Sequence, residues 1–121
     1  MDVEKIIVVI EDVHSLYGMS AKSNFNFGHI KGFKEGVLTA YGFDYKLVAP
    51  KVWQRGVWTE EDVIIKKGKK DTKATSLNAA KRLWPNHDFR KSNRAKKPHD
   101  GIIDAALMAE YARTINEDND R

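Results

Sequence analysis

The stretch Ile6-Ile7-Val8-Val9-Ile10-Glu11-Asp12 decides the fold that we expect for this chain. Its run of Ile and Val is too short to span a membrane and too uniformly apolar for a half-solvated edge, so it predicts a strand buried on both faces. Ligands and catalytic groups gather at the carboxyl ends of buried strands in open α/β sheets. Glu11 is therefore the first candidate for chemistry, although a carboxylate there could simply mark the return to water. His14 could approach the same site, but a lone histidine is more often a surface or hydrogen-bonding residue.

Length and composition indicate one small globular domain. The chain has 121 residues, 41% of them hydrophobic, and no internal repeat. We expect a single domain over residues 1–116, followed by an acidic tail at 117–121. No apolar run approaches the length of a transmembrane helix, so we expect a soluble, cytoplasmic protein without membrane contact. Because cysteine is absent, a metal would have to be held by oxygen or imidazole ligands.

The net charge of +4 hides a strong asymmetry. Residues 66–97 contain 12 of the 21 Lys and Arg but only Asp71 and Asp88 among the acidic residues, so this basic block carries +10 and the rest of the chain carries −6. Such a block is what a polyanion-binding surface requires. A solvated loop is the commoner origin of a charge run, but the neighbouring acidic residues favour nucleic acid.

The first strand is followed by a helix and a second strand. Apolar residues at steps of three and four over 25–41 predict a helix that ends at Gly42. Gly28, Gly32 and Gly36 recur on another face, which suggests close approach by another backbone, either the sheet or the same helix of a second subunit. Residues 43–50 alternate as a strand does. The strand, helix, strand order predicts parallel pairing of the two strands.

The middle of the chain predicts a mixture of short helices and exposed loops. Trp53 opens a helical turn that packs on the core, and Thr59 suits the N-cap of another turn. Residues 66–70 indicate an exposed loop. Asp71 is the expected N-cap of a helix that ends before Pro85. Residues 86–98 are polar and basic, so we expect them to be mobile without a ligand.

The last helix begins near Asp100 and should fray after Ile115. Asp100 and Asp104 are four residues apart, so both project from the same face of its first turn. Their mutual repulsion is partly offset by the positive end of the helix dipole, and capping alone could explain both residues. Together with Glu11 they would also supply three hard oxygen ligands, which suit Mg²⁺ or Mn²⁺.

These features together resemble the ribonuclease H-like nucleases of the RuvC-like Holliday junction resolvase type, particularly the phage versions. The resembling segments follow the family's order over most of the chain: 9–14, 25–28 with the glycine helix, 46–53, 70–73 and 99–105. The resemblance implies an α/β fold with a mixed sheet flanked by helices. It also implies an enzyme of bacterial or phage-infected cells that acts in DNA recombination or repair.

The resemblance also implies roles for individual residues. Glu11, Asp100 and Asp104 match carboxylates that are catalytic and bind Mg²⁺ or Mn²⁺, and two such ions promote phosphodiester hydrolysis in this family. The family cuts branched DNA as a homodimer, and the glycine stripe (Gly28, Gly32 and Gly36) would suit the interface. The residues that we expect to contact DNA are Lys69, Lys70, Lys73, Arg94, Lys96 and Lys97.

The family opens with an Asp-bearing strand and two further strands that have no counterpart here. We therefore expect an N-terminally incomplete domain. Three readings follow: a fragment of a longer product, a domain completed by another chain, or a protein that binds DNA without cutting it. A non-catalytic nucleic-acid-binding module and a purely structural dimerisation domain are thus the alternatives to a nuclease.

Overall fold

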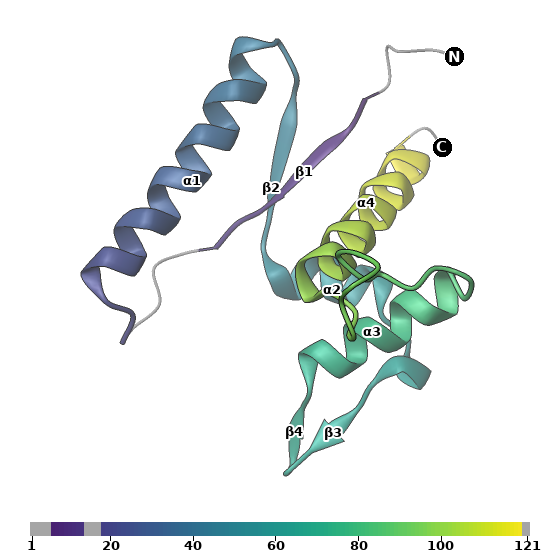
Figure 1. The fold of residues 1–121 in the computed structure, drawn as a ribbon. Coiled ribbons are helices and arrows are strands. Elements are labelled where there is room, and N and C mark those ends of the chain that lie inside the picture. The colour runs from purple at the N-terminus through teal and green to yellow at the C-terminus, as the bar shows by residue number, and fades with distance from the viewer. Residues whose placement is uncertain (1–5, 14–17, 120–121) are drawn as a thin grey trace. The chain divides into compact units, whose positions relative to one another are not determined.

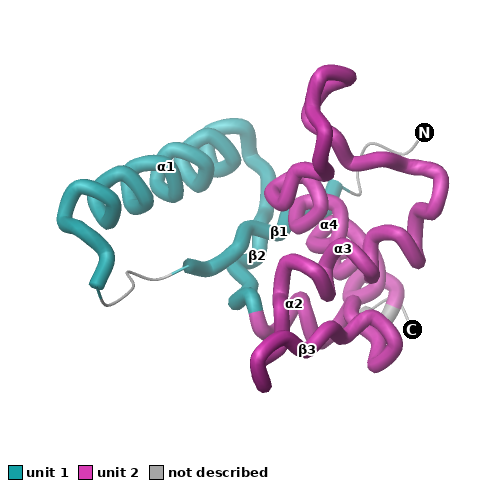
Figure 2. Tube along the Cα trace, turned by 60° about the horizontal axis from the view of Figure 1, so that its bottom comes forward, with its two compact units in different colours: residues 1–50 teal, residues 51–121 magenta. Residues whose placement is uncertain are grey.

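The protein is an α/β chain, and its described residues, 6–13 and 18–119, form helices and short strands in a computed structural model (Figure 1). For residues 118 and 119 only the backbone is described. The chain divides into two compact units, Met1–Pro50 and Lys51–Arg121 (Figure 2). No helix within the described ranges combines the length and apolar character needed to cross a bilayer. The single domain expected over residues 1–116 stays a prediction.

The first unit pairs two parallel strands that are joined through one long helix. Strand β1 (Val8–Glu11) lies beside β2 (Tyr45–Val48), with Val8 opposite Tyr45 and Glu11 opposite Val48. Helix α1 (Ala21–Ala40) occupies the connection between them. The backbone N–H of Asp12 donates to the Val48 carbonyl at 2.8 Å and continues the pairing beyond β1. The predicted strand, helix, strand order and the parallel pairing are confirmed.

The prediction that the first strand is buried on both faces is wrong for the described residues. Every residue of β1 is half-buried, and the preceding Ile6 and Ile7 are 50% and 38% exposed. The physical reason is that β1 pairs with β2 alone in the part of the chain that is described. A strand in a two-stranded sheet keeps one open edge and does not bury both faces.

Helix α1 ends where the sequence predicted, but it begins at Ala21 rather than near residue 25, and its packing differs from the prediction. Its first turn is capped by the Ser20 hydroxyl, which accepts from the Ser23 N–H at 3.1 Å, and Gly42 follows its end with a φ of +78°. None of its side chains is buried against the described residues. Phe25, Phe33 and Tyr41 are 75%, 68% and 77% exposed. The aromatic side chains of the predicted apolar stripe are therefore left largely uncovered by the described residues.

The glycine stripe of α1 is equally uncovered. A Cβ atom built on Gly28, Gly32 or Gly36 meets no atom of the described chain within 4 Å. The sheet is therefore not the close neighbour that the stripe suggested. Two polar contacts connect α1 to the strand segments: Lys31 with Asp12 at 3.0 Å, and the Tyr45 hydroxyl with Glu35 at 3.2 Å.

The second unit packs three helices around a small core. Trp53 of α2 (Pro50–Val57) and Leu107 of α4 (Asp100–Asn119) are fully buried. Helix α3 (Thr72–Leu83) lies beside α4, and its buried residues are all small: Thr75, Ser76, Ala79 and Ala80. Small side chains allow the backbones of neighbouring helices to approach closely. The expected burial of Trp53 is confirmed.

The beginnings of α3, α4 and a short 3₁₀ helix agree with the prediction, whereas the end of α4 does not. The Asp71 carboxylate accepts from the Ala74 N–H at 3.0 Å, as expected of the N-cap of α3. The short 3₁₀ helix η1 (Glu60–Asp62) follows Thr59 as predicted. Fraying after Ile115 is wrong, because α4 continues to Asn119. Arg113 pairs with side chains three residues before it and four residues after it, which supports the last turns.

The predicted exposed loop at 66–70 is a hairpin. Strands β3 (Ile65–Lys66) and β4 (Lys69–Lys70) pair antiparallel. Lys67 and Gly68 between them have φ values of +52° and +74°. Positive φ at both central residues is the signature of a type I′ hairpin turn. The lysine-rich composition hid this turn.

Residues 86–98 have anchors that their polar composition did not predict. Phe89 is 3% exposed, and its ring lies 6.0 Å from Trp84 and 4.5 Å from His87. Its carbonyl accepts from the His99 N–H at 2.8 Å. A bridge between Arg90 and Pro98 closes the segment on itself. We predicted a mobile segment, but the structure shows a loop that is anchored through the buried ring of Phe89.

Candidate functional site

Asp100 and Asp104 line one pocket of the second unit, as their spacing predicted. The pocket has a volume of about 150 Å³ and lies between α2, α3 and α4. Its polar lining includes Gln54 from α2 and Thr72 and Ser76 from α3. Asp100 is exposed and Asp104 is half-buried. Carboxylate, hydroxyl and amide oxygens are the donors that a hard divalent cation prefers, so the chemistry of this lining fits Mg²⁺ or Mn²⁺.

Lys73 brings positive charge to the same pocket. Its Nζ lies 3.4 Å from the Asp100 carboxylate, and both side chains are mostly exposed, at 78% and 57%. An exposed pair of this kind is held weakly. Lys73 therefore offsets the repulsion between Asp100 and Asp104 while staying able to turn toward another anion.

The start of α4 holds the two carboxylates in place. The His99 carbonyl accepts from the Ile103 N–H at 3.1 Å, and the His99 ring nitrogen Nδ1 accepts from the Ile102 N–H at 3.3 Å. A Cβ atom on Gly101 would lie 3.0 Å from the His99 ring. Glycine is the residue that leaves room for this capping arrangement beside Asp100.

A larger, cation-lined groove shares residues with the carboxylate pocket. It has a volume of about 500 Å³, and Gln54 and Thr72 line both hollows. Two elements contribute cationic side chains to its lining: α2 contributes Lys51 and Arg55, and β4 contributes Lys70. We call this hollow the cation-lined groove. Acidic oxygens and a row of cations thus adjoin each other within the second unit.

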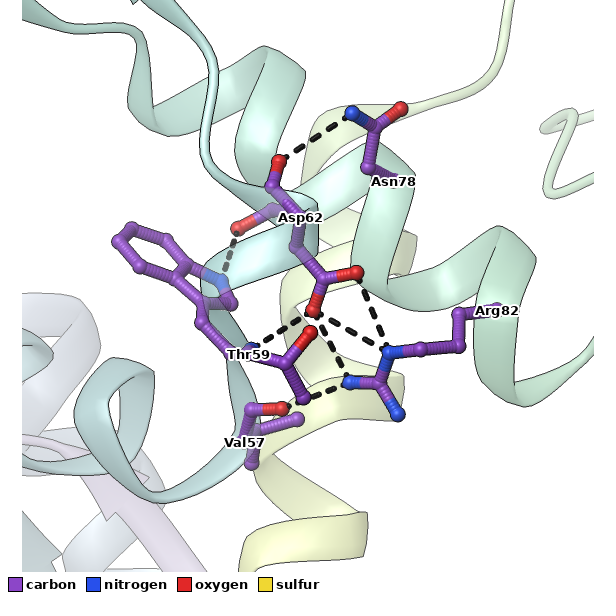
Figure 3. A network of polar contacts seen from close by, with 7 residues as sticks. Val57, Thr59, Asp62, Asn78 and Arg82 are labelled. Carbon is purple, nitrogen blue, oxygen red and sulfur yellow. Dashed lines mark hydrogen bonds and ion pairs between the residues drawn. The ribbon is translucent and has the colours of Figure 1, made fainter.

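An ion pair with a buried carboxylate lies beside Thr59, which lines the groove (Figure 3). Asp62 is 3% exposed, and its carboxylate accepts from Arg82 at 3.0 Å and from the Thr59 N–H at 2.8 Å. Arg82 also donates to the Val57 carbonyl at 2.9 Å, and Asn78 donates to the Asp62 carbonyl at 3.2 Å. Burial alone raises the pKa of Asp62, but the hydrogen bonds from Arg82 and Thr59 outweigh it and lower the pKa below its usual value.

Glu11 lies in a separate hollow of the first unit. This hollow, of about 160 Å³, is lined by Glu11 and Val13 and by residues of α1 that include Lys31 and Lys34. The neighbouring Asp12 forms a hydrogen bond with Lys31, which raises the pKa of that lysine. Two lysines and a carboxylate at the end of a strand give this hollow a mixed charge.

The predicted three-carboxylate site stays a prediction. Asp100 and Asp104 share a pocket in the second unit, whereas Glu11 belongs to the first unit. Across residues 6–13 and 18–119, no three acidic or histidine side chains gather as a metal-binding group. His14 lies outside the described residues.

The predicted DNA-contacting cations fall into two groups. Lys69 and Lys70 lie on β4, and Lys70 lines the cation-lined groove, while Lys73 lines the carboxylate pocket. The other three lie exposed along the loop that leads into α4, and two of them directly precede Pro98; these residues are Arg94, Lys96 and Lys97. Whether any of them contacts DNA stays a prediction.

Sequence reasoning missed the polar face of α2. Lys51, Gln54, Arg55 and Trp58 follow one another at steps of three, one and three, which places them along one side of a helix. All four line the cation-lined groove. The buried Trp53 had marked the opposite face as the core side, so the signal was present in the sequence. It was overlooked because these residues precede the basic block.

Comparisons of the sequence with models of protein families and with curated proteins, and of the fold with solved structures, found no match.

Proposed function

We propose that this chain is a metal-dependent, structure-selective DNA endonuclease that hydrolyses phosphodiester bonds at Holliday or other branched junctions. The observation that carries the proposal is the joint lining of one pocket by Asp100, Asp104 and Lys73, beside the cation-lined groove. A phosphodiesterase needs acidic oxygens where the bond breaks and cations where the backbone lies. The second unit supplies both.

The order of elements supports a ribonuclease H-like arrangement of the resolvase type. Glu11 ends a strand that pairs in parallel with the next one, and Asp100 and Asp104 lie one turn apart at the start of the last helix. In this proposal Glu11 completes the carboxylate set. The resemblance in sequence and the parallel β1–β2 pair point in the same direction.

The residues of the pocket suit Mg²⁺ or Mn²⁺ as cofactor. Asp100 and Asp104 would hold the ion together with oxygens of Thr72, Ser76 or Gln54. When bound, such an ion activates water and stabilises the leaving oxygen. The chain's own contribution is to orient the scissile phosphate. Lys73, held beside Asp100, is placed to attract that phosphate and to neutralise its charge.

The test is cleavage of a synthetic four-way junction by the full chain with Mg²⁺ or Mn²⁺. We expect Asp104→Asn and Glu11→Gln to abolish cleavage and to leave junction binding intact, because each keeps the shape of the side chain and removes its charge. Asp44→Asn, at an exposed position in the first unit, is the matched control and should cut like the parent. If both Asp104→Asn and Glu11→Gln cut like the parent, the assigned carboxylates are wrong.

A non-catalytic nucleic-acid-binding module is the second candidate. It is favoured by the +10 charge of residues 66–97. It predicts salt-sensitive DNA binding with no metal-dependent strand scission. Scission of the junction by the parent chain separates the two candidates directly. Charge reversal across residues 66–73 that left DNA affinity unchanged would instead favour a structural dimerisation domain.

We further propose that the working form is a homodimer joined through α1. The helix presents exposed aromatic side chains and an uncovered glycine stripe, and a second α1 is the partner whose backbone the stripe would admit. Gly32→Leu should yield a monomer in sedimentation experiments, because its side chain enters open space in one chain and blocks close helix approach between two. Gly32→Ala should keep the dimer. A parent chain that sediments as a monomer would rule out this assembly.

A further inference from the structure

The cation-lined groove gathers cations from two elements of the second unit, α2 and β4. Across the described residues, Lys51, Arg55 and Lys70 form no ion pair, whereas other cations of the second unit do. Lys66, for example, pairs with Asp71 at 3.3 Å. One carboxylate, Glu60, contributes to the lining. A hollow lined by three cations that form no ion pair with a described residue attracts an anion.

Trp58 holds one of these cations over the groove. The Lys70 Nζ lies 5.5 Å from the centre of the Trp58 ring, within the range of a cation–π contact. The ring itself is fixed from two sides. Its N–H donates to the Ser76 hydroxyl at 3.2 Å, and Trp53 meets it edge-on at 6.4 Å. Contact with a fixed ring reduces the number of conformations that the long Lys70 side chain adopts. Its ammonium group is therefore held at the groove.

We propose that the cation-lined groove binds the sugar–phosphate backbone of one nucleic-acid strand. Lys51, Arg55 and Lys70 contact successive phosphates, and Trp58 is a positioning residue for Lys70. The volume of about 500 Å³ is enough for a few sugar–phosphate units of one strand. This inference rests on the proposed function for the identity of the polyanion. Since the groove shares Gln54 and Thr72 with the carboxylate pocket, a strand bound there leads to Asp100 and Asp104.

The inference is tested by binding of a single-stranded oligothymidine to the full chain with a chelator present, so that cleavage plays no part. Lys51→Gln with Arg55→Gln should weaken binding about tenfold at low salt. The slope of log affinity against log salt should fall by about 0.7 for each lost phosphate contact. The matched control is Lys81→Gln with Lys91→Gln, which removes the same charge from exposed positions outside the groove lining. An unchanged slope in the groove variant, or an equal loss in the control, would overturn the inference.

Trp58 variants separate positioning from mere folding. Trp58→Leu removes the ring face, so its salt slope should fall to that of Lys70→Gln, whereas Trp58→Phe keeps a ring face and should retain the parent slope. A slope for Trp58→Leu equal to the parent's would refute the positioning role. Failure of the nuclease proposal is read from a different experiment. If the parent chain never cuts a junction but the groove variants show the expected slopes, the groove inference stands and the nuclease proposal fails. If the parent chain cuts and the groove variants keep its slope, the groove inference fails and the nuclease proposal stands.

Discussion

The Asp62–Arg82 pair offers the sharpest test of what holds the second unit together. Replacing Arg82 by Met keeps much of the side-chain length and removes the charge. The Asp62 carboxylate then stays buried, at 3% exposure, with the Thr59 N–H as its remaining donor among the contacts described above. Removing one partner of a buried pair is costly because the other charge is left without compensation.

The size of the effect follows from burial. Breaking a fully buried ion pair costs about 3–5 kcal/mol. Arg82 is 34% exposed, so water can reach part of the vacated space, and we expect the lower end, about 3 kcal/mol. Arg90→Met is the matched control, because Arg90 is exposed to nearly the same extent, at 36%, whereas its partner Asp88, at 2.9 Å, is 60% exposed. That exposed pair should contribute less than about 1 kcal/mol.

Urea unfolding followed by tryptophan fluorescence measures this difference. All 3 tryptophans belong to the second unit, so their emission follows the unfolding of that unit. Adding Asp62→Asn to Arg82→Met should recover part of the loss, because the amide is neutral and still accepts from Thr59. If Arg82→Met loses no more free energy of unfolding than Arg90→Met, the pair does not stabilise the unit as argued.

Acid stability, aromatic burial and close helix packing in the second unit can each be tested. The lowered pKa of Asp62 contributes stability that is present above its usual value of 3.8 and is lost as pH falls through the lower folded value. The free energy of unfolding, measured as a function of pH, should show this loss. The loss should be smaller in Asp62→Asn, which lacks the carboxylate. Phe89→Ala should destabilise the second unit by about 3 kcal/mol in urea, since the ring is buried, whereas Phe25→Ala, at an exposed ring, should change stability by less than about 0.5 kcal/mol. Gly56→Ala would bring a Cβ within 2.8 Å of the Tyr111 ring, so its melting temperature should fall, by an amount equivalent to about 1–3 kcal/mol of overpacking, and the smaller ring-free side chain of Tyr111→Leu should relieve the loss.

The local signals in the sequence were reliable. Asp71 predicts the start of α3 because its side chain satisfies a backbone N–H within the same turn. Gly42 predicts the end of α1 because the chain turns there through a positive φ. The four-residue spacing of Asp100 and Asp104 predicts that they share a pocket. Each of these signals acts over one turn, where sequence distance and spatial distance nearly coincide.

The features that were missed depend on contacts between distant residues. Phe89 is one aromatic residue in a polar segment, and its burial follows from packing on Trp84, which composition does not show. The half-exposed state of β1 follows from the number of neighbouring strands rather than from its apolar run. The polar face of α2 becomes a groove wall only when β4 brings Lys70 to it. Propensity decided which segments are helical, whereas tertiary packing decided what their faces meet.

The bare surface of α1 has a consequence for its amide protons. A 20-residue helix with no side chain buried among the described residues gains little stability from packing on them, and its three glycines weaken it by about 1 kcal/mol each relative to alanine. Its amide protons should therefore exchange with heavy water almost as fast as those of a free peptide, while those of α3 and α4 exchange slowly. Any molecule that covers α1 would slow its exchange first, so the deuterium uptake of this one helix reports occupancy.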